Sequence, residues 1–315
     1  MARPTWDWEG RVGRRVKLRD IHVLSVVVRS GSMSKAATQL AMSQSAVSEA
    51  IASLEDALRV RLLDRMSQGI APTIYAEILL ERGKVVFDEL QQGIKDIEFL
   101  LDSTVGEVKV AAAEFLSVWL LPAAIDGMLR EYPRIHIHTQ LTNSERLEFP
   151  DLLDRKVDLV IDRVPRNFSK SDDLDIEVLL EDRHCVVAGM HSPWARRRKI
   201  TLAELKDEPW VIPANPVAAA VLREAFEVEG LQAPSEQVLA GSVLLRINLL
   251  ATGRFLSLMT DSIFRGAGKD LPFKVLPIQL RATPPPIVII RLKNRTLSPV
   301  VQLFIEQLRS VAGLT

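Results

Sequence analysis

Residues 43 to 55 read SQSAVSEAIASLE, a stretch whose hydroxyl, amide and carboxylate side chains could hydrogen-bond to the edges of DNA bases. Gln pairs well with adenine, Ser with several bases, and Glu can accept from the amino group of cytosine. Val47, Ile51 and Leu54 recur at helical spacing and form one apolar face, so the polar side chains lie on the other. The stretch therefore predicts a helix that reads DNA without a Lys or Arg of its own.

Cations that could hold DNA phosphates lie outside this helix. Lys35 precedes it, Arg65 follows it, and residues 1–19 carry six basic groups against two acidic ones. The basic arm is either a disordered tail or a segment that adds phosphate contacts through counterion release. The start of the helix itself offers backbone amides to an anion. The candidate DNA-binding residues are Lys35, Ser43, Gln44, Ser45, Ser48, Glu49 and Arg65.

The elements around this helix predict a winged helix-turn-helix. Apolar spacing indicates a first helix that ends at Gly31, a second that Ser34 caps and a third that Ser43 caps. The segment RLLDRMSQGIAPT then predicts two short strands and a tight turn, which would form the wing. The alternative is an all-α module whose third helix is a solvated surface with no role in DNA binding.

A run without proline from Ile74 to Asp102 predicts one long helix. Gly83 and Gly93 interrupt it and leave room for a close partner helix or a bend. An apolar stripe along such a helix needs a partner, and pairing with a second copy of the chain is favoured over packing on the chain's own second domain. The stripe consists of Leu79, Val86, Leu90, Ile94, Ile97 and Leu101.

Beyond Gly106 strands and helices alternate, which predicts parallel sheets that helices cover on both faces. Helices are expected over 117–131 and 144–155. Two lobes are expected, with the chain entering the second near residue 166 and leaving it near residue 274. Ligands bind such sheets beyond the carboxyl ends of the strands. The candidate effector-binding residues at those ends are Glu114, Phe115, Ser117, Thr142, Asn143, Ser144, Arg163, Pro213 and Ser242.

The chemistry of these residues points to a polar effector. Helix N-termini and the guanidinium of Arg163 favour a carboxylate. Glu114 opposes an anion by like charge, so a ligand with both signs, or one rich in hydroxyls, also suits the set. Each of these residues could instead be a helix cap or part of a surface ion pair, and Arg163 could pair with Asp162 or Glu114.

The composition narrows the function classes further. The 315 residues suggest two or three domains, and a net charge of zero means that any DNA contact depends on local charge. The lone Cys185 is expected to be a buried small hydrophobe. The charged N-terminus and the lack of a long apolar run predict a cytoplasmic protein without a membrane helix. His136 and His138 lack companions with metal-ligand spacing, so no metal or other cofactor is expected, and no catalytic motif indicates an enzyme.

The stretch LRDIHVLSVVVRSGSMSKAATQLAMSQSAVSEAIASLEDALRVRLLDR resembles the DNA-binding domain of LysR-type transcriptional regulators. PTIYAEILLERGK is similar to the start of that family's linker helix, and GEVKVAAAEFLSVWLLPAAIDGMLREYPRIHIH and LLDRKVDLVIDR to its effector domain. Ser45 stands where the family often has Pro, and Glu49, Ala50 and Ser53 replace frequent basic or amide residues, so the family's operator does not transfer. The matching features are Gly31-Ser32, Ala36-Ala37, Leu40, Ser43-Gln44, Val47-Ser48, Ile51, Leu54-Glu55 and Leu62-Leu63-x-Arg65.

The resemblance covers about residues 18 to 310 and implies an α/β fold class: an N-terminal winged helix-turn-helix, a long linker helix and a two-lobe type 2 periplasmic-binding-like effector domain. By alignment with the family, the cleft positions include Glu114, Phe115, Ser144, Arg163 and Pro213. The implied domains are an arm over 1–17, a DNA-binding domain over 18–76, a dimerisation helix over 77–104, and an effector domain over 105–315 with lobe I at about 105–165 and 274–315 and lobe II at about 166–273.

The resemblance also implies what the protein does. It implies a regulator whose partners are double-stranded promoter DNA, a small-molecule effector, further copies of the chain in a dimer or tetramer, and RNA polymerase. The alternative is a cytoplasmic two-lobe ligand-binding protein whose N-terminal helices only dimerise.

Overall fold

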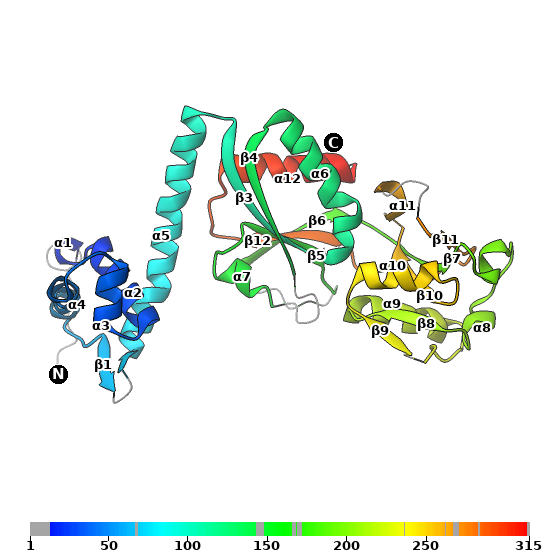
Figure 1. Ribbon diagram of the computed structural model, residues 1–315, viewed down its shortest axis with the longest axis horizontal. Helices are drawn as coiled ribbons and strands as arrows, with labels where there is room; N and C mark the ends of the chain where they lie inside the picture. The colour runs from blue at the N-terminus through cyan, green and yellow to red at the C-terminus, as the bar shows by residue number, and fades with distance from the viewer. Residues whose placement is uncertain are drawn as a thin grey trace. The chain divides into compact units, whose positions relative to one another are not determined.

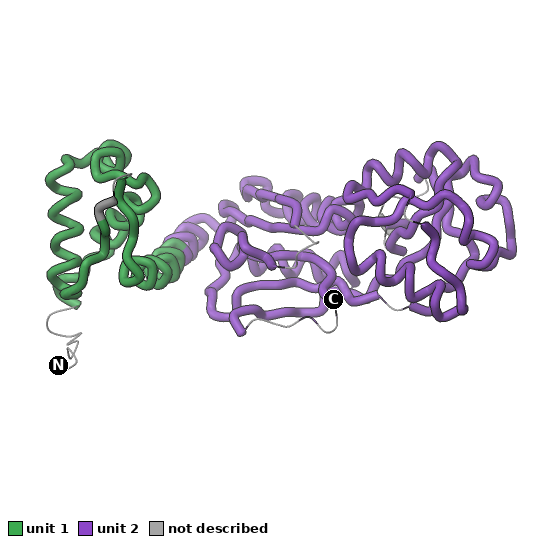
Figure 2. The backbone as a smooth tube through the Cα atoms, turned by 90° about the horizontal axis from the view of Figure 1, so that it is seen from below, with its two compact units in different colours: residues 1–91 green, residues 92–315 purple. Residues whose placement is uncertain are grey.

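The computed structural model describes residues 13–66, 69–142, 148–165, 168, 172–235, 237–261, 263–266, 271–282 and 284–313, apart from the side chains of residues 65, 66, 265 and 266. The chain forms two compact units, residues 1–91 and 92–315, which Figure 2 colours separately. Each unit has a hydrophobic core of its own.

The first unit is a small helical domain with a two-stranded wing (Figure 1, blue to cyan). The two strands pair antiparallel, with Leu63 opposite Pro72. This arrangement confirms the predicted winged helix-turn-helix. The elements are α1 (Gly13–Arg15), α2 (Leu18–Ser30), α3 (Met33–Gln39), α4 (Gln44–Leu58), β1 (Leu63–Met66), β2 (Gly69–Pro72) and the start of α5 (Ile74–Leu101).

Local caps fix where these helices begin and end. Gly31 ends α2 in the left-handed conformation, with φ of 65°. The Ser32 hydroxyl accepts from the backbone N–H of Lys35 at 3.5 Å, so α3 begins one residue later. The prediction that Ser34 caps this helix is wrong, because Ser32 has the extended backbone of a cap and Ser34 already lies in the first turn. Ser43 caps α4 as predicted, accepting from the N–H of Ala46 at 3.1 Å.

Helix α5 joins the core of the first unit through one part of its surface. A Cβ at Gly83 would lie 3.0 Å from Cγ2 of Ile21, so this glycine allows α5 and α2 to approach closely. Leu79 packs against the same core. The rest of the predicted stripe is exposed and forms an apolar strip along α5 that the described residues leave uncovered. Its members are Val86, Leu90, Ile94, Ile97 and Leu101.

The first lobe of the second unit is built on a five-stranded sheet in the order β4-β3-β5-β12-β6. β3 pairs in parallel with β4 and β5, whereas β12 runs antiparallel to β5 and β6. Helices α6 and α12 pack together on one face, and α7 lies on the other (Figure 1). The elements are β3 (Val105–Ala112), α6 (Leu120–Glu131), β4 (Arg134–Leu141), α7 (Pro150–Leu153), β5 (Leu159–Arg163), β6 (Leu174–Leu180), β12 (Ile287–Leu292) and α12 (Pro299–Ala312).

The second lobe has its own five-stranded sheet, in the order β11-β7-β10-β8-β9. β8 is parallel to β9 and β10, and β7 is antiparallel to β10 and β11. Trp210 and Phe226 pack edge to face in its core, with ring centroids 6.0 Å apart. The elements are β7 (His184–Gly189), α8 (Leu202–Leu205), β8 (Trp210–Pro213), α9 (Pro216–Val228), β9 (Val238–Ala240), α10 (Val243–Ala251), β10 (Leu256–Thr260), α11 (Ile263–Gly266) and β11 (Phe273–Val275).

The lobe boundaries differ from those predicted. The predicted crossing near residue 166 would put β6 in the second lobe, but β6 hydrogen-bonds to β12 in the first sheet. β11 still belongs to the second sheet, so the chain returns to the first lobe only with β12. Both sheets are mixed rather than parallel, because β12 and β7 run antiparallel to their neighbours.

Two helices predicted from the sequence are shorter in the structure than expected. The helix expected over 117–131 is divided into a 3₁₀ turn, Glu114–Val118, and α6, because the backbone of Trp119 leaves the helical conformation between them. The helix expected over 144–155 is reduced to α7 among the described residues, since Pro150 lacks an N–H and occupies the first turn of a helix. Residues 143–147 lie outside the described part of the chain.

None of the helices in the part of the chain that the structure describes has both the length and the apolar composition that crossing a bilayer requires.

The end of α4 yields a stability prediction. Arg59 follows the helix with φ of 53°, a left-handed conformation that strains a residue with a Cβ. Arg59→Gly should raise the free energy of unfolding of the first unit by about 1 kcal/mol, measured by urea denaturation of the full chain. The control is Arg61→Gly, since the φ of Arg61 is not positive and the replacement should be destabilising. A lower free energy of unfolding for Arg59→Gly would show that contacts of the Arg59 side chain stabilise the first unit by more than the left-handed backbone costs.

Candidate functional site

The polar face of α4 is accessible over its first two turns. The opposite face, including Val47 and Leu54, is buried in the core of the first unit. The hydroxyl of Ser43 both caps the helix and lies 2.9 Å from the hydroxyl of Ser45. The exposed candidates are Ser43, Gln44, Ser45, Ser48 and Glu49.

The candidate cations lie on other elements of the first unit. Lys35 is exposed in the first turn of α3. The side chain of Arg65 lies outside the description, although its backbone pairs with Ile70 in the wing. Arg15, near the end of the basic arm, forms an exposed ion pair with Asp56 of α4 at 2.8 Å. One basic group of the arm therefore contacts α4 itself, while residues 1–12 lie outside the described part.

A cleft in the second unit brings several candidate effector residues together. It has a cavity volume of about 400 Å³, within the range of small-molecule sites. It lies between the ends of β3 and β4 in one lobe and the ends of β8 and β9 in the other. The candidates that line it are Glu114, Phe115, Thr142, Pro213 and Ser242, together with Ala113, Leu141, Ala214, Asn215, Gly241, Val243 and Arg246.

Glu114 links the two lobes across this cleft. Its carboxylate accepts from the backbone N–H of Val243 at 2.9 Å and from the hydroxyl of Ser242 at 3.2 Å, both at the start of α10. A carboxylate is stabilised at the positive end of a helix. Glu114 therefore already occupies the place where the sequence suggested that an anionic effector could bind.

Arg163 is buried below the cleft. Its guanidinium pairs with Asp182 at 2.8 Å, a partner that the sequence did not suggest, and also donates to the carbonyl oxygens of Asp182 and Pro285. The guanidinium carbon lies 5.4 Å from the centroid of the Phe115 ring. Arg163 lines a separate recess of about 50 Å³, not the open cleft.

The remaining candidates do not join this group. Ser117 is exposed on the 3₁₀ turn and does not line the cleft, because the turn directs Phe115 toward the cavity and Ser117 to solvent. Asn143 and Ser144 lie outside the described residues. Their predicted roles are therefore left as predictions.

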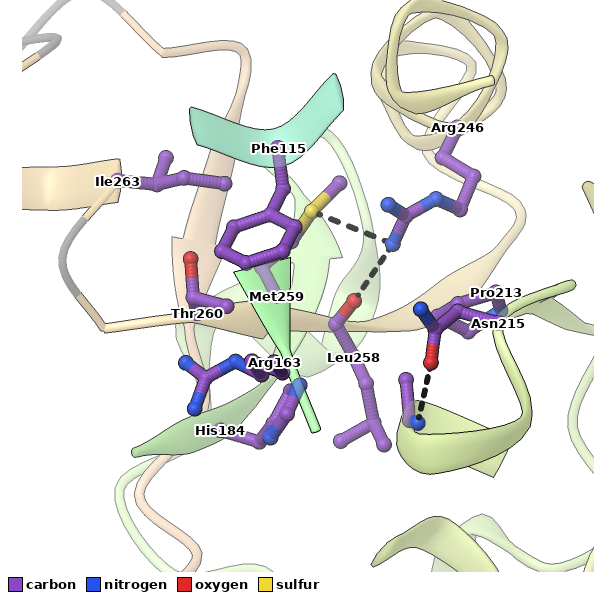
Figure 3. A pocket seen from close by; sticks show the side chains of 11 residues that line it. Phe115, Arg163, His184, Pro213, Asn215, Arg246, Leu258, Met259, Thr260 and Ile263 are labelled. Atoms are coloured by element: carbon purple, nitrogen blue, oxygen red, sulfur yellow. Dashed lines mark hydrogen bonds between the residues drawn. The ribbon is translucent and has the colours of Figure 1, made fainter. Parts of the chain in front are cut away.

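Sequence reasoning missed Arg246, which lines both the cleft and the recess. It is buried on α10, and Figure 3 shows it reaching from that helix to the carbonyl oxygen of Leu258, at 2.9 Å, and the sulfur of Met259. The available signal was its place in VLLRINLLA, where it is the one charged residue and shares a helix face with Val243 and Leu250.

Burial shapes the protonation of this region. It lowers the pKa of Arg246 to about 10, although the charge of Glu114 acts in the other direction. It also lowers the pKa of Arg163, against the effect of Asp182. Burial, with Arg163 and Arg246 nearby, lowers the pKa of His184 to about 3, so this imidazole is neutral at pH 7. Cys185 is buried as predicted, and burial raises the pKa of its thiol to about 12.

The fold and these sites define a class of protein: a DNA-binding regulator with a two-lobe ligand-binding module. The helix-turn-helix model of the lysR family of bacterial regulators matches residues 18–77, and the LysR substrate-binding domain model matches residues 102–313. The chain therefore belongs to the LysR family and is a LysR-type DNA-binding transcriptional regulator with an effector-binding domain.

Individual relatives agree with this assignment. The HTH-type transcriptional regulator GbpR of Azospirillum brasilense is 23% identical over 300 residues, covering 95% of this chain and 87% of its own. The uncharacterized HTH-type transcriptional regulator YeiE of Escherichia coli K12 is 32% identical over 197 residues, covering 62% of this chain and 64% of its own. Because the relatives are regulators, a non-enzymatic role is supported, and the alternative of a ligand-binding protein without DNA binding is not favoured.

Solved structures share the fold. Full-length CbnR in complex with its target DNA has a TM-score of 0.54 at 20% identity and covers 94% of this chain and 100% of its own. A full-length variant of OxyR from Pseudomonas aeruginosa has a TM-score of 0.61 at 17% identity and covers 95% of each chain.

The half-buried His184, whose Nδ1 is shielded from solvent, predicts a pH dependence of stability. Its pKa is lower in the folded chain than in the unfolded one, so the unfolded state binds more protons below pH 6.5 and stability falls as the pH is lowered. Between pH 6.5 and 5 the loss should reach about 2 kcal/mol, and His184→Asn should reduce it in thermal unfolding across that range. The control is His191→Asn, because His191 is exposed. An unchanged slope in His184→Asn would contradict the lowered pKa of this imidazole.

Proposed function

We propose that this regulator binds promoter DNA by placing α4 in the major groove and reading bases with uncharged and acidic side chains. The observation that carries the proposal is the division of α4 into a buried apolar face and an exposed polar one. Phosphate contacts then come from Lys35, from Arg65, from the amide-rich start of α4 and from the arm. The proposed base-reading residues are Ser43, Gln44, Ser45, Ser48 and Glu49.

We further propose that the chain acts through α5 as a dimer, or as a tetramer made of two such dimers. Five apolar residues lie exposed in a strip along this helix, and Leu101 is 82% exposed. Soluble helices bury strips of this kind against a partner. Two copies would present two α4 helices to repeated half-sites.

The effector is proposed to bind in the cleft of the second unit. The cleft offers a carboxylate, an arginine, two helix starts and the hydroxyls of Thr142 and Ser242. Such a lining suits polar ligands, carboxylic acids among them. Such a ligand can regulate the protein only if it binds one arrangement of the chain better than another. RNA polymerase is proposed as the further partner that receives the change at the promoter.

The base-reading proposal predicts a loss of discrimination. Gln44→Ala and Ser48→Ala should each reduce the preference for a selected operator over a scrambled duplex by about 1–3 kcal/mol, since each removes a base-edge partner. Binding titrations at one fixed salt concentration would measure the preference. Ser53→Ala is the matched control, because Ser53 is exposed near the other end of α4. The proposal fails if both variants fold and keep the wild-type preference.

The dimer proposal predicts a change in mass. Leu90→Glu combined with Ile97→Glu should give a monomer in sedimentation equilibrium, because an interface of α5 strips would bury two carboxylates without partners. Gln91→Glu adds a charge at an exposed position of the same helix and should leave the assembly unchanged. An oligomer that survives the double substitution would place the interface elsewhere.

A further inference from the structure

Three buried arginines lie in the described part of the second unit, and they differ in their partners. Arg163 pairs with Asp182 at 2.8 Å, and Arg295 with Asp158 at 3.2 Å. Arg246 is only 6% exposed, yet no carboxylate among the described residues lies within ion-pair distance of it. Burying a charge without a counter-charge is costly, so this guanidinium calls for an explanation.

The hydrogen bonds of Arg246 are incomplete as well. One terminal nitrogen donates to the carbonyl oxygen of Leu258, and Nε is buried with no acceptor among the described residues. Nε of Arg163 and Nδ1 of His184 are also buried without a partner there, and both residues line the same recess as Arg246. An arginine Nε can only donate, so Arg163 and Arg246 leave two buried donors in this recess without an acceptor among the described residues.

Glu114 does not supply the missing acceptor. Its two carboxylate oxygens are engaged by the hydroxyl of Ser242 and the N–H of Val243. It is close enough for its charge to act on Arg246, since it counters the fall in the arginine's pKa. Glu114 therefore caps the start of α10. The guanidinium of Arg246, one turn further along that helix, has no ion-pair partner among the described residues.

The cavity walls beside Arg246 are mostly apolar. Phe115 and Pro213 line both the cleft and the recess, and Figure 3 shows the Phe115 ring beside the Met259 side chain. Leu141, Val243, Ala113 and Ala214 add further apolar surface to the cleft. A ligand that fits would carry one compact anionic group and an apolar body of a few carbon atoms.

We infer that Arg246 is the counter-ion for the effector, and that the effector is a small monocarboxylate whose body packs against Phe115 and Pro213. This inference rests on the proposed function, since it concerns the same cleft. Arg246 is not among the residues that the sequence indicated, and Glu114 has the opposite effect on an anionic ligand. Glu114 holds the lobes together through α10 and repels an incoming anion.

The test uses the purified full-length chain and four probes at constant ionic strength: butyrate, hexanoate, and their neutral amides butyramide and hexanamide. Isothermal titration should show each acid binding at least about tenfold more tightly than its amide, because only the acid is a counter-ion. In Arg246→Met the acid should bind no better than the amide. Arg223→Met removes an exposed arginine from α9 and should keep the preference.

A second substitution separates charge from folding. Glu114→Gln should strengthen binding of both acids by about tenfold and leave the amides unchanged, because it removes a like charge beside the site. Circular dichroism checks that each variant is folded. The inference is overturned if acid and amide bind alike, if no acid binds, or if Arg246→Met keeps the preference. Tight binding of inorganic phosphate in place of the acids would overturn the carboxylate assignment.

DNA binding distinguishes this inference from the proposed function. If the chain retains operator DNA but shows no preference for acids, the anion site is wrong and the regulator stands. If it binds the acids through Arg246 and no DNA, the anion site stands and the promoter-binding proposal fails.

Discussion

The burial of one face of α4 is the constraint on which the DNA-binding half of this protein depends. Val47 and Leu54 have no exposed surface, so the helix cannot rotate without exposing its core side chains. The opposite face is thereby committed to solvent or to a partner. Because that face holds no basic residue, the proposed DNA complex divides its contacts: base specificity would come from hydrogen-bonding groups on α4, and electrostatic affinity from cations on other parts of the chain.

The ligand-binding half follows from a second constraint, the meeting of strand ends and helix starts between two sheets. β3 ends at Glu114 in one lobe, while β8 and α10 bring Pro213 and Arg246 from the other. Glu114 uses this arrangement to cap α10, which ties the lobes together with two hydrogen bonds. A ligand that changes this contact would change how the lobes are held, which is the kind of difference an effector must exploit.

Local chemistry made much of the fold predictable. Gly31, Ser43 and the hydrophobic spacing of α4 act over a few residues, so the helix-turn-helix and wing could be read from the sequence. Two local predictions were wrong because a neighbouring residue determines where the helix begins. Ser32, not Ser34, caps α3, and α7 begins at Pro150 rather than just after Asn143. The place of Arg246 in the cleft could not be predicted from local sequence, because it depends on Leu258 and Glu114, which only the tertiary fold brings near. The base contacts remain predictions.

A helix without positive charge is proposed to give this regulator its sequence specificity. The most direct measurement is the selection and sequencing of fragments of the source genome that the full-length chain retains. We expect enrichment of fragments that share two related half-sites, separated by about one turn of DNA or a multiple of it. Retention of fragments with no common sequence, at an affinity set by salt alone, would contradict it.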